Sequence, residues 1–161
     1  MEVNETVFLQ EIRSNQGIIY KLVGLYARDA EERKDLYQEV LLQTWKAWPS
    51  FRGESKFSTW LYRICLNTIL TQRRKRSPIE YKDSLKDLRN AVPHPGDVGQ
   101  DARHLQWAIR QLGETDRAII SMHLDGYANS EMAAIIGISV NNIAVKLHRI
   151  KQQLSNLLKQ K

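Results

Sequence analysis

Apolar residues recur along the first half of the chain every three or four positions, which is the period of one face of an α-helix. The first such face lies at residues 8–12 and a longer one at 18–26. Two more lie at 36–44 and 57–68. The pattern predicts a group of amphipathic helices over residues 1–77 that bury their apolar faces against one another.

Capping residues and a proline indicate where these helices begin and end. Asp29 can cap the helix that follows it, and Glu31 and Glu32 suit the positive end of its dipole. That helix must end before Pro49, because the residue before a proline avoids the helical conformation. Residues 49–55 contain proline, glycine and serine and are predicted to form a loop.

The helical period is lost in the middle of the chain, over residues 78–104. This stretch holds Pro78, Pro93, Pro95, Gly96 and Gly99 and is locally acidic. We predict a flexible linker there. The predicted fold is therefore all-α, with two small helical domains at 1–77 and 105–161, the second containing a helix-turn-helix.

The second domain shows the spacing of a helix-turn-helix. After a helix capped by Thr115 or Asp116, a short helix opened by Asn129 or Ser130 is expected to end at Gly137, which can adopt a left-handed turn. Ser139 can then cap the last helix.

This last helix can enter a major groove, with amides directed at base edges and cations at phosphates. Its predicted outward residues are Asn141, Asn142, Ala144, Val145, Lys146, His148 and Arg149. The alternative is a helical hairpin that serves packing alone.

The charge distribution predicts two contacts with a polyanion. The net charge is +6, and two tracts, residues 55–79 and 132–161, hold no acid but several lysines and arginines. Two separate positive tracts suit two separate phosphate contacts. Two solvated helix faces are the alternative.

The first tract interleaves aromatic and basic residues, a combination suited to single-stranded DNA. Cations follow the backbone while rings support an extruded base. The candidate residues are Arg52, Lys56, Trp60, Arg63, Asn67, Arg73 and Arg74. Phe57 and Trp60 could equally serve packing alone. Trp45 and Trp48 are expected in the core or at a partner surface.

Composition excludes several other classes of protein. The 161 residues include no apolar run long enough to span a membrane, and the polar start is unlike a signal peptide. We therefore expect a cytoplasmic protein without membrane insertion. The single cysteine, Cys65, excludes an internal disulfide and is expected in the core. The scattered histidines predict neither a metal site nor a cofactor.

Three segments in the same order resemble the extracytoplasmic-function sigma factors, and the resemblance covers almost the whole chain. Residues 35–42 are similar to the family's polymerase-binding helix and 51–67 to its promoter-melting segment. Residues 112–117 and the helix-turn-helix are similar to its second domain. The segment 140–151 is similar to sigma factors of the Bacteroidetes.

The resemblance implies that domain 1–77 binds the clamp coiled coil of the largest polymerase subunit and melts the −10 element. Domain 105–161 would read the −35 element and meet the polymerase flap, and an anti-sigma factor is a further expected partner. The implied polymerase contacts are Asp35, Gln38, Glu39, Leu42 and Gln43. Ala144 and His148 depart from the family's usual recognition helix, so the −35 sequence does not carry over.

Two other classes of function are the alternatives to a sigma factor. A stand-alone helix-turn-helix regulator explains residues 105–161 equally well but leaves segment 51–67 without a role. An enzyme acting on nucleic acid would need paired carboxylates, a metal cluster, a nucleophile motif or a phosphate loop, and none of these is recognisable. We therefore predict a protein that is not an enzyme.

Overall fold

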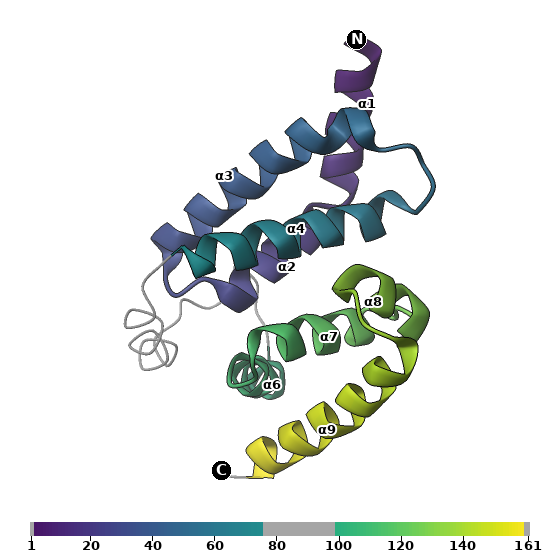
Figure 1. Ribbon diagram of the computed structural model, residues 1–161. Helices are drawn as coiled ribbons and strands as arrows, with labels where there is room; N and C mark the ends of the chain where they lie inside the picture. The colour runs from purple at the N-terminus through teal and green to yellow at the C-terminus, as the bar shows by residue number, and fades with distance from the viewer. Residues whose placement is uncertain (1, 76–98, 160–161) are drawn as a thin grey trace. The chain divides into compact units, whose positions relative to one another are not determined.

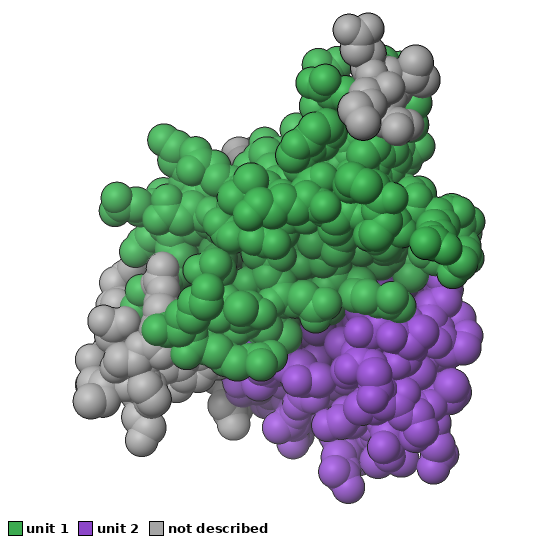
Figure 2. Space-filling view, turned by 45° about the horizontal axis from the view of Figure 1, so that its top comes forward, with its two compact units in different colours: residues 1–77 green, residues 78–161 purple. Residues whose placement is uncertain are grey.

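The computed structural model describes residues 2–75 and 99–159, whose regular structure is helical throughout (Figure 1). The chain divides into two compact units, residues 1–77 and 78–161, which Figure 2 colours separately. The predicted all-α class is confirmed. Most of the predicted linker lies outside the described residues.

Unit 1 contains four helices and a short 3-10 turn: α1 (Glu2–Ser14), α2 (Gln16–Tyr26), α3 (Ala30–Ala47), η1 (Trp48–Ser50) and α4 (Phe57–Arg74). Helices α2, α3 and α4 pack pairwise on one another, as Figure 1 shows. Their apolar stripes meet in a core that water does not reach, built from Ile19, Leu22, Val23, Tyr26, Val40, Leu61, Tyr62, Cys65 and Ile69.

The helix boundaries of unit 1 follow the predicted signals. The Asp29 side chain accepts a hydrogen bond from the Glu32 backbone N–H at 2.7 Å, which satisfies one donor at the start of α3. Helix α3 ends at Ala47, and Pro49 lies in η1. Residues 51–56 then form the predicted loop before α4.

Unit 2 is built from α6 (Gln100–Arg110), α7 (Glu114–Leu124), α8 (Asn129–Ile136) and α9 (Val140–Lys159). Helix α9 packs against the other three. Among the core side chains of this unit are Ala108, Ile119, Met122, Met132, Ile143 and Ile150.

Three predicted boundaries in unit 2 were displaced by one or more residues. Helix α6 begins at Gln100, inside the stretch predicted as linker. Helix α7 begins directly after Gly113, so Thr115 and Asp116 lie in its first turn and do not cap it. At α8 the residue before the helix is Ala128, whose methyl group cannot cap, so neither Asn129 nor Ser130 is the cap; the Glu131 side chain accepts from the Ala128 backbone N–H at 3.1 Å, which is one half of a capping box.

Membrane-spanning helices and metal-binding clusters are both absent from the part of the chain that the structure describes. Among residues 2–75 and 99–159, no helix is both long and apolar enough to cross a membrane. Within the same part of the chain, histidine, cysteine and carboxylate side chains form no group of three or more that could hold a metal ion.

Candidate nucleic-acid interface

The turn between α8 and α9 has the predicted helix-turn-helix geometry. Gly137 has φ 88°, in the left-handed region that side chains with a Cβ rarely adopt. Its backbone N–H donates to the Ala133 carbonyl at 2.8 Å and closes α8. Two residues later the Ser139 hydroxyl accepts from the Asn142 backbone N–H at 3.1 Å and opens α9.

The two helices pack through small and apolar side chains. Ala133 is buried, and Ile143 and Leu147 are buried on the inner face of α9. Of the seven predicted outward residues, Lys146 is half-buried and the other six are exposed: Asn141, Asn142, Ala144, Val145, His148 and Arg149. The outer face of α9 therefore presents amides and cations to solvent with no carboxylate, which suits DNA.

The loop between η1 and α4 borders a hollow of about 420 Å³. Gly53 at its tip has φ 73° and permits the tight turn. We call this the loop hollow; it is lined by Ser50, Phe51, Arg52, Glu54, Ser55, Trp60 and Arg63. It combines two aromatic rings with two guanidinium groups, as predicted for a strand-binding segment. Lys56 is exposed but does not line it.

A cluster of rings supports the loop hollow from the protein side. The Trp60 ring centre lies 4.9 Å from that of Phe51 and 6.2 Å from that of Trp48. Phe57 is buried in the same cluster, so it packs. Trp60 is half-buried and both packs and lines the hollow. Of the two other tryptophans in unit 1, Trp48 joins this cluster and Trp45 is exposed.

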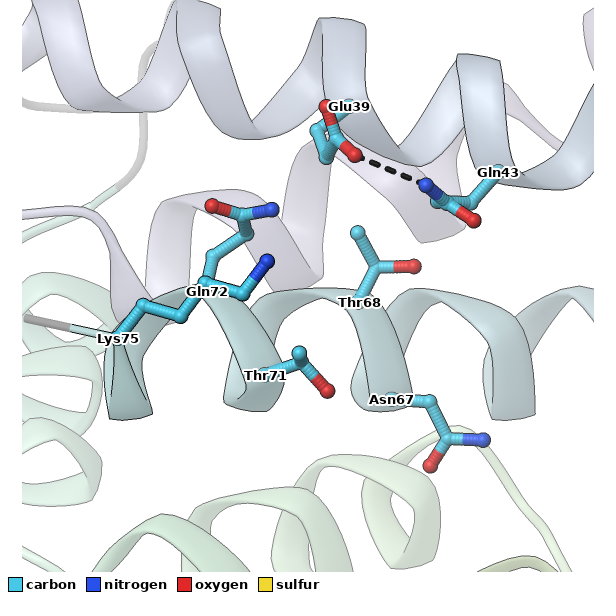
Figure 3. Close-up of a pocket in the computed structure, with 7 residues that line it drawn as sticks. All are labelled: Glu39, Gln43, Asn67, Thr68, Thr71, Gln72 and Lys75. Carbon is cyan, nitrogen blue, oxygen red and sulfur yellow. Dashed lines mark hydrogen bonds between the residues drawn. The ribbon is translucent and has the colours of Figure 1, made fainter.

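A second hollow, of about 230 Å³, lies between α3 and α4 (Figure 3). We call it the interhelix hollow; its lining residues are Glu39, Gln43, Asn67, Thr68, Thr71, Gln72 and Lys75. Arg63 and Asn67 both belong to the predicted −10 set and lie four residues apart on α4. Both are exposed on α4, but Arg63 lines the loop hollow and Asn67 lines the interhelix hollow.

The five predicted polymerase contacts divide in a similar way. Asp35, Gln38 and Leu42 are exposed on the outer face of α3, where Leu42 forms an apolar edge. Glu39 and Gln43 are half-buried and line the interhelix hollow on the side of α4.

Arg73 corrects the predicted DNA-binding set. Its side chain is buried, and its guanidinium donates to the Tyr26 carbonyl and pairs with the Glu32 carboxylate at 3.4 Å. A buried guanidinium in such a pair is not available to a phosphate, so Arg73 leaves the set. Arg74 beside it is exposed.

Eight hollow-lining residues were not among the predicted sites: Ser50, Phe51, Glu54, Ser55, Thr68, Thr71, Gln72 and Lys75. The sequence contained a signal for two of them, since Thr71 and Lys75 follow the predicted Asn67 at helical spacing. What it lacked was the partner helix, because Glu39 and Gln43 come from a distant part of the chain.

Comparisons with known proteins place both units in one family. The family model described as Sigma-70 region 2 matches residues 12–79, and Sigma-70, region 4 matches 103–154. The ECF RNA polymerase sigma-E factor of Escherichia coli (strain K12) is 30% identical over 157 residues, covering 88% of this chain and 81% of the relative. The chain is an extracytoplasmic-function sigma factor of the sigma-70 family.

Other relatives agree with this assignment. ECF RNA polymerase sigma factor SigM of Mycobacterium tuberculosis (strain H37Rv) is 26% identical, covering 94% of this sigma factor and 76% of the relative. In fold, the chain is similar to the sigma factor RpoE of Bartonella quintana, solved in complex with the anti-sigma factor NepR. That match has a TM-score of 0.76 at 24% identity and covers 96% of this chain and 98% of the other.

A second solved structure, CnrH in complex with the cytosolic domain of CnrY, matches with a TM-score of 0.68 at 20% identity and covers 96% of this chain and 89% of the other. Membership of the family identifies the function: this sigma factor directs promoter-specific initiation by RNA polymerase. The region 2 match also rejects the stand-alone regulator, which had no role for the first half of the chain.

Proposed function

We propose that unit 1 captures an unpaired strand of the −10 element in the loop hollow, while α9 reads the −35 element as duplex DNA. The observation that supports this proposal is the composition of the loop hollow. Phe51 and Trp60 offer ring faces beside the guanidinium groups of Arg52 and Arg63. Unpairing and unstacking a base costs a few kcal/mol, so promoter opening needs contacts that duplex DNA does not offer. Rings beside cations supply them.

Recognition of the −35 element is assigned to the outer face of α9. Asn141 and Asn142 lie in its first turn, where a recognition helix meets base edges. Lys146 lies about one turn further along and Arg149 about two, and both suit phosphates. Ala144, Val145 and His148 complete the proposed surface, with Val145 placed to meet an apolar thymine methyl.

Polymerase docking is assigned to the outer face of α3. Asp35 and Gln38 flank the exposed Leu42, whose side chain is 45% accessible. An apolar centre with a charged edge is the usual composition of a protein interface. We assign the clamp coiled coil of the largest subunit to this face and the polymerase flap to unit 2. Charge reversal at Asp35 should weaken co-purification with core polymerase while the fold stays intact.

Three further properties complete the proposal: where the protein works, whether it catalyses a reaction, and what inhibits it. The protein works in the cytoplasm beside the polymerase, and it contributes binding energy without catalysing a reaction itself. An anti-sigma factor also binds it. Two observations support this part of the proposal: of the structures similar in fold, RpoE was solved with the anti-sigma factor NepR, and CnrH was solved with the cytosolic domain of CnrY.

Promoter opening by purified holoenzyme tests the central proposal. Arg52→Ala and Arg63→Ala, which both change the lining of the loop hollow, should reduce permanganate reactivity of unpaired −10 thymines far more than they reduce filter binding of the same promoter. Arg13→Ala is the matched control, because Arg13 is an exposed cation on α1 outside every proposed contact. Normal reactivity in both variants would remove this segment from strand opening. So would an equal loss on a pre-melted template, because it would indicate failed core binding.

A further inference from the structure

Helix α1 is held to unit 1 by two side chains. Between residues 5 and 14, Phe8 and Ile12 are the buried members of the helix, and each is 5% accessible. They are four residues apart and therefore lie on one face. A helix of 13 residues is marginal in water on its own, so docking through these two side chains keeps α1 in place.

Phe8, the aromatic member of this pair, packs against two tryptophans at once. Its ring centre lies 5.0 Å from that of Trp45 and 5.4 Å from that of Trp48. Trp45 is in the last turn of α3 and Trp48 opens η1, and Figure 1 shows α1 beside this part of the chain. Helix α1 therefore supports the point where α3 gives way to the loop.

Trp48 carries this contact on to the loop hollow. Its ring stacks on that of Phe51, with centres 5.6 Å apart and an angle of 20° between the planes. Trp60, the other ring in the lining, has its centre 6.2 Å from that of Trp48. The Phe51 backbone N–H also donates to the Trp48 carbonyl at 3.0 Å. A shift of Trp48 would therefore move both the ring and the backbone that begin the hollow.

The backbone at Trp48 leaves its position to side-chain packing. The 3-10 turn η1 is only three residues long, and its proline has no backbone N–H to donate. Within η1, Pro49 and Ser50 are exposed and Trp48 is half-buried. Trp48 is therefore the anchor of this turn, and the start of the loop depends on what packs against it.

We propose that Phe8 is a positioning residue for promoter opening: through it, α1 holds Trp48 and keeps Phe51 in place at the loop hollow. A ring that is already ordered costs less free energy to bind a base than one that must be ordered on arrival. The region 2 family model begins at residue 12, so Phe8 precedes the residues that it matches. The inference rests on the proposed function, because it requires the strand to enter the loop hollow.

Two alanine variants of α1 separate positioning from stability. Phe8→Ala and Ile12→Ala each empty one site of equal burial, so both should lower the urea concentration at which the protein unfolds. Phe8→Ala should in addition slow open-complex formation by purified holoenzyme about fivefold, the order expected from the loss of one aromatic contact with Trp48. Ile12→Ala should stay within about twofold of wild type. Permanganate reactivity of −10 thymines over time measures the rate, at a temperature where both variants are folded.

A double variant tests the route through Trp48. If Phe8 acts by holding Trp48, then Phe8→Ala should slow opening no further in a Trp48→Ala background, whereas independent effects would multiply. Filter binding of the duplex promoter should be unchanged in Phe8→Ala, because the recognition helix α9 belongs to unit 2.

A milder pair keeps the test decisive if Phe8→Ala does not fold. Phe8→Leu leaves an apolar side chain under α1 but removes the ring, and it should slow opening about threefold. Ile12→Val is its matched control and should open promoters at the wild-type rate.

Failure of this proposal can be distinguished from failure of the proposed function. Equal opening rates for the Phe8 and Ile12 variants would overturn the role of Phe8, because α1 would then act through stability alone. Multiplying losses in the double variant would overturn it as well. Arg52→Ala, measured in the same assay, reports on the loop hollow itself. Normal opening by Arg52→Ala would overturn strand capture there, whereas slow opening by Arg52→Ala beside normal opening by Phe8→Ala would overturn the role of Phe8 alone.

Discussion

The Arg73 guanidinium lies 3.4 Å from the Glu32 carboxylate, and both side chains are buried in unit 1. Glu32 also accepts from the Arg28 backbone N–H at 3.0 Å and from the Arg28 Nε at 3.1 Å. Arg73 donates in addition to the carbonyl of Tyr26, the last residue of α2. This network joins the end of α2, the first turn of α3 and the last turn of α4.

Removing one partner of this pair should destabilise unit 1 strongly. Arg73→Ala removes the more buried of the two cations beside the Glu32 carboxylate and leaves Arg28 in place, so the cost should lie below the roughly 3–5 kcal/mol typical of a fully unpaired buried charge. Arg74→Ala, on the exposed neighbour, should change the free energy of unfolding by no more than about 0.5 kcal/mol. Urea unfolding followed by tryptophan fluorescence measures both. Equal stabilities for the two variants would contradict the structural role of Arg73.

Arg73 also illustrates what sequence patterns leave undecided. The run from Arg73 to Arg76 is a uniform basic tract in which nothing distinguishes the first member. Arg73 is buried because it pairs with Glu32, which is 41 residues away in the chain. Local periodicity carries no information about such a partner, because the register of two packed helices determines which side chains meet.

The same physical reason separates the two candidate surfaces. The helix-turn-helix was predictable because Ala133, Gly137 and Ser139 act within one short segment, and the turn is local. The interhelix hollow was not, since Glu39 on α3 meets Gln72 on α4 only through tertiary packing. The loop hollow lies between these cases: its residues are close in sequence, but the ring contacts that shape it are not periodic.

Cys65 should be chemically inert in the folded protein. Its side chain is fully buried, and burial raises the pKa of the thiol well above its ordinary value. The folded state therefore keeps the proton above pH 8.5, where the unfolded chain begins to release it. Iodoacetamide labelling should stay slow from pH 7 to 9 and become fast only in denaturant.

The raised pKa of Cys65 also determines the direction in which pH changes the free energy of unfolding. Above about pH 8.5 the unfolded chain binds fewer protons at this site than the folded protein, so this site lowers the free energy of unfolding as pH rises. Cys65→Ala would remove that contribution. Rapid labelling of the native protein, with a rate that rises with pH as for an exposed thiol, would contradict the assignment.

Trp48 should matter for promoter opening although it does not line the loop hollow. Its ring stacks on Phe51 with centres 5.6 Å apart, and Phe8 of α1 lies 5.4 Å away on another side. Trp48→Ala should slow open-complex formation about tenfold, because each aromatic contact is worth roughly 0.5–1.5 kcal/mol. Permanganate reactivity over time measures the rate.

A conservative change separates positioning from general damage. Trp48→Phe keeps a ring in contact with Phe51 and should restore most of the opening rate. Core polymerase binding should be the same in both variants, since Trp48 lies in η1, beyond the end of the helix that carries Asp35, Gln38 and Leu42. An alanine variant that opens promoters at the normal rate would show that the cluster has no influence on the hollow.

The recognition helix should separate charge from sequence readout. Lys146→Ala and Arg149→Ala each remove one predicted phosphate contact, so each should weaken binding to all upstream sequences similarly. The slope of log K against log salt should fall by about one unit in each case, because fewer counterions are released. Asn142→Ala removes an amide near the start of α9 and should instead cost about 1–3 kcal/mol at one base pair, leaving the slope unchanged.

Lys159→Ala is the matched control, since Lys159 is an exposed cation at the far end of the same helix. Fluorescence anisotropy with holoenzyme across a salt series measures all four variants. If Lys159→Ala lowers the slope as much as Arg149→Ala does, α9 acts as a diffuse positive surface and the docked recognition helix is wrong.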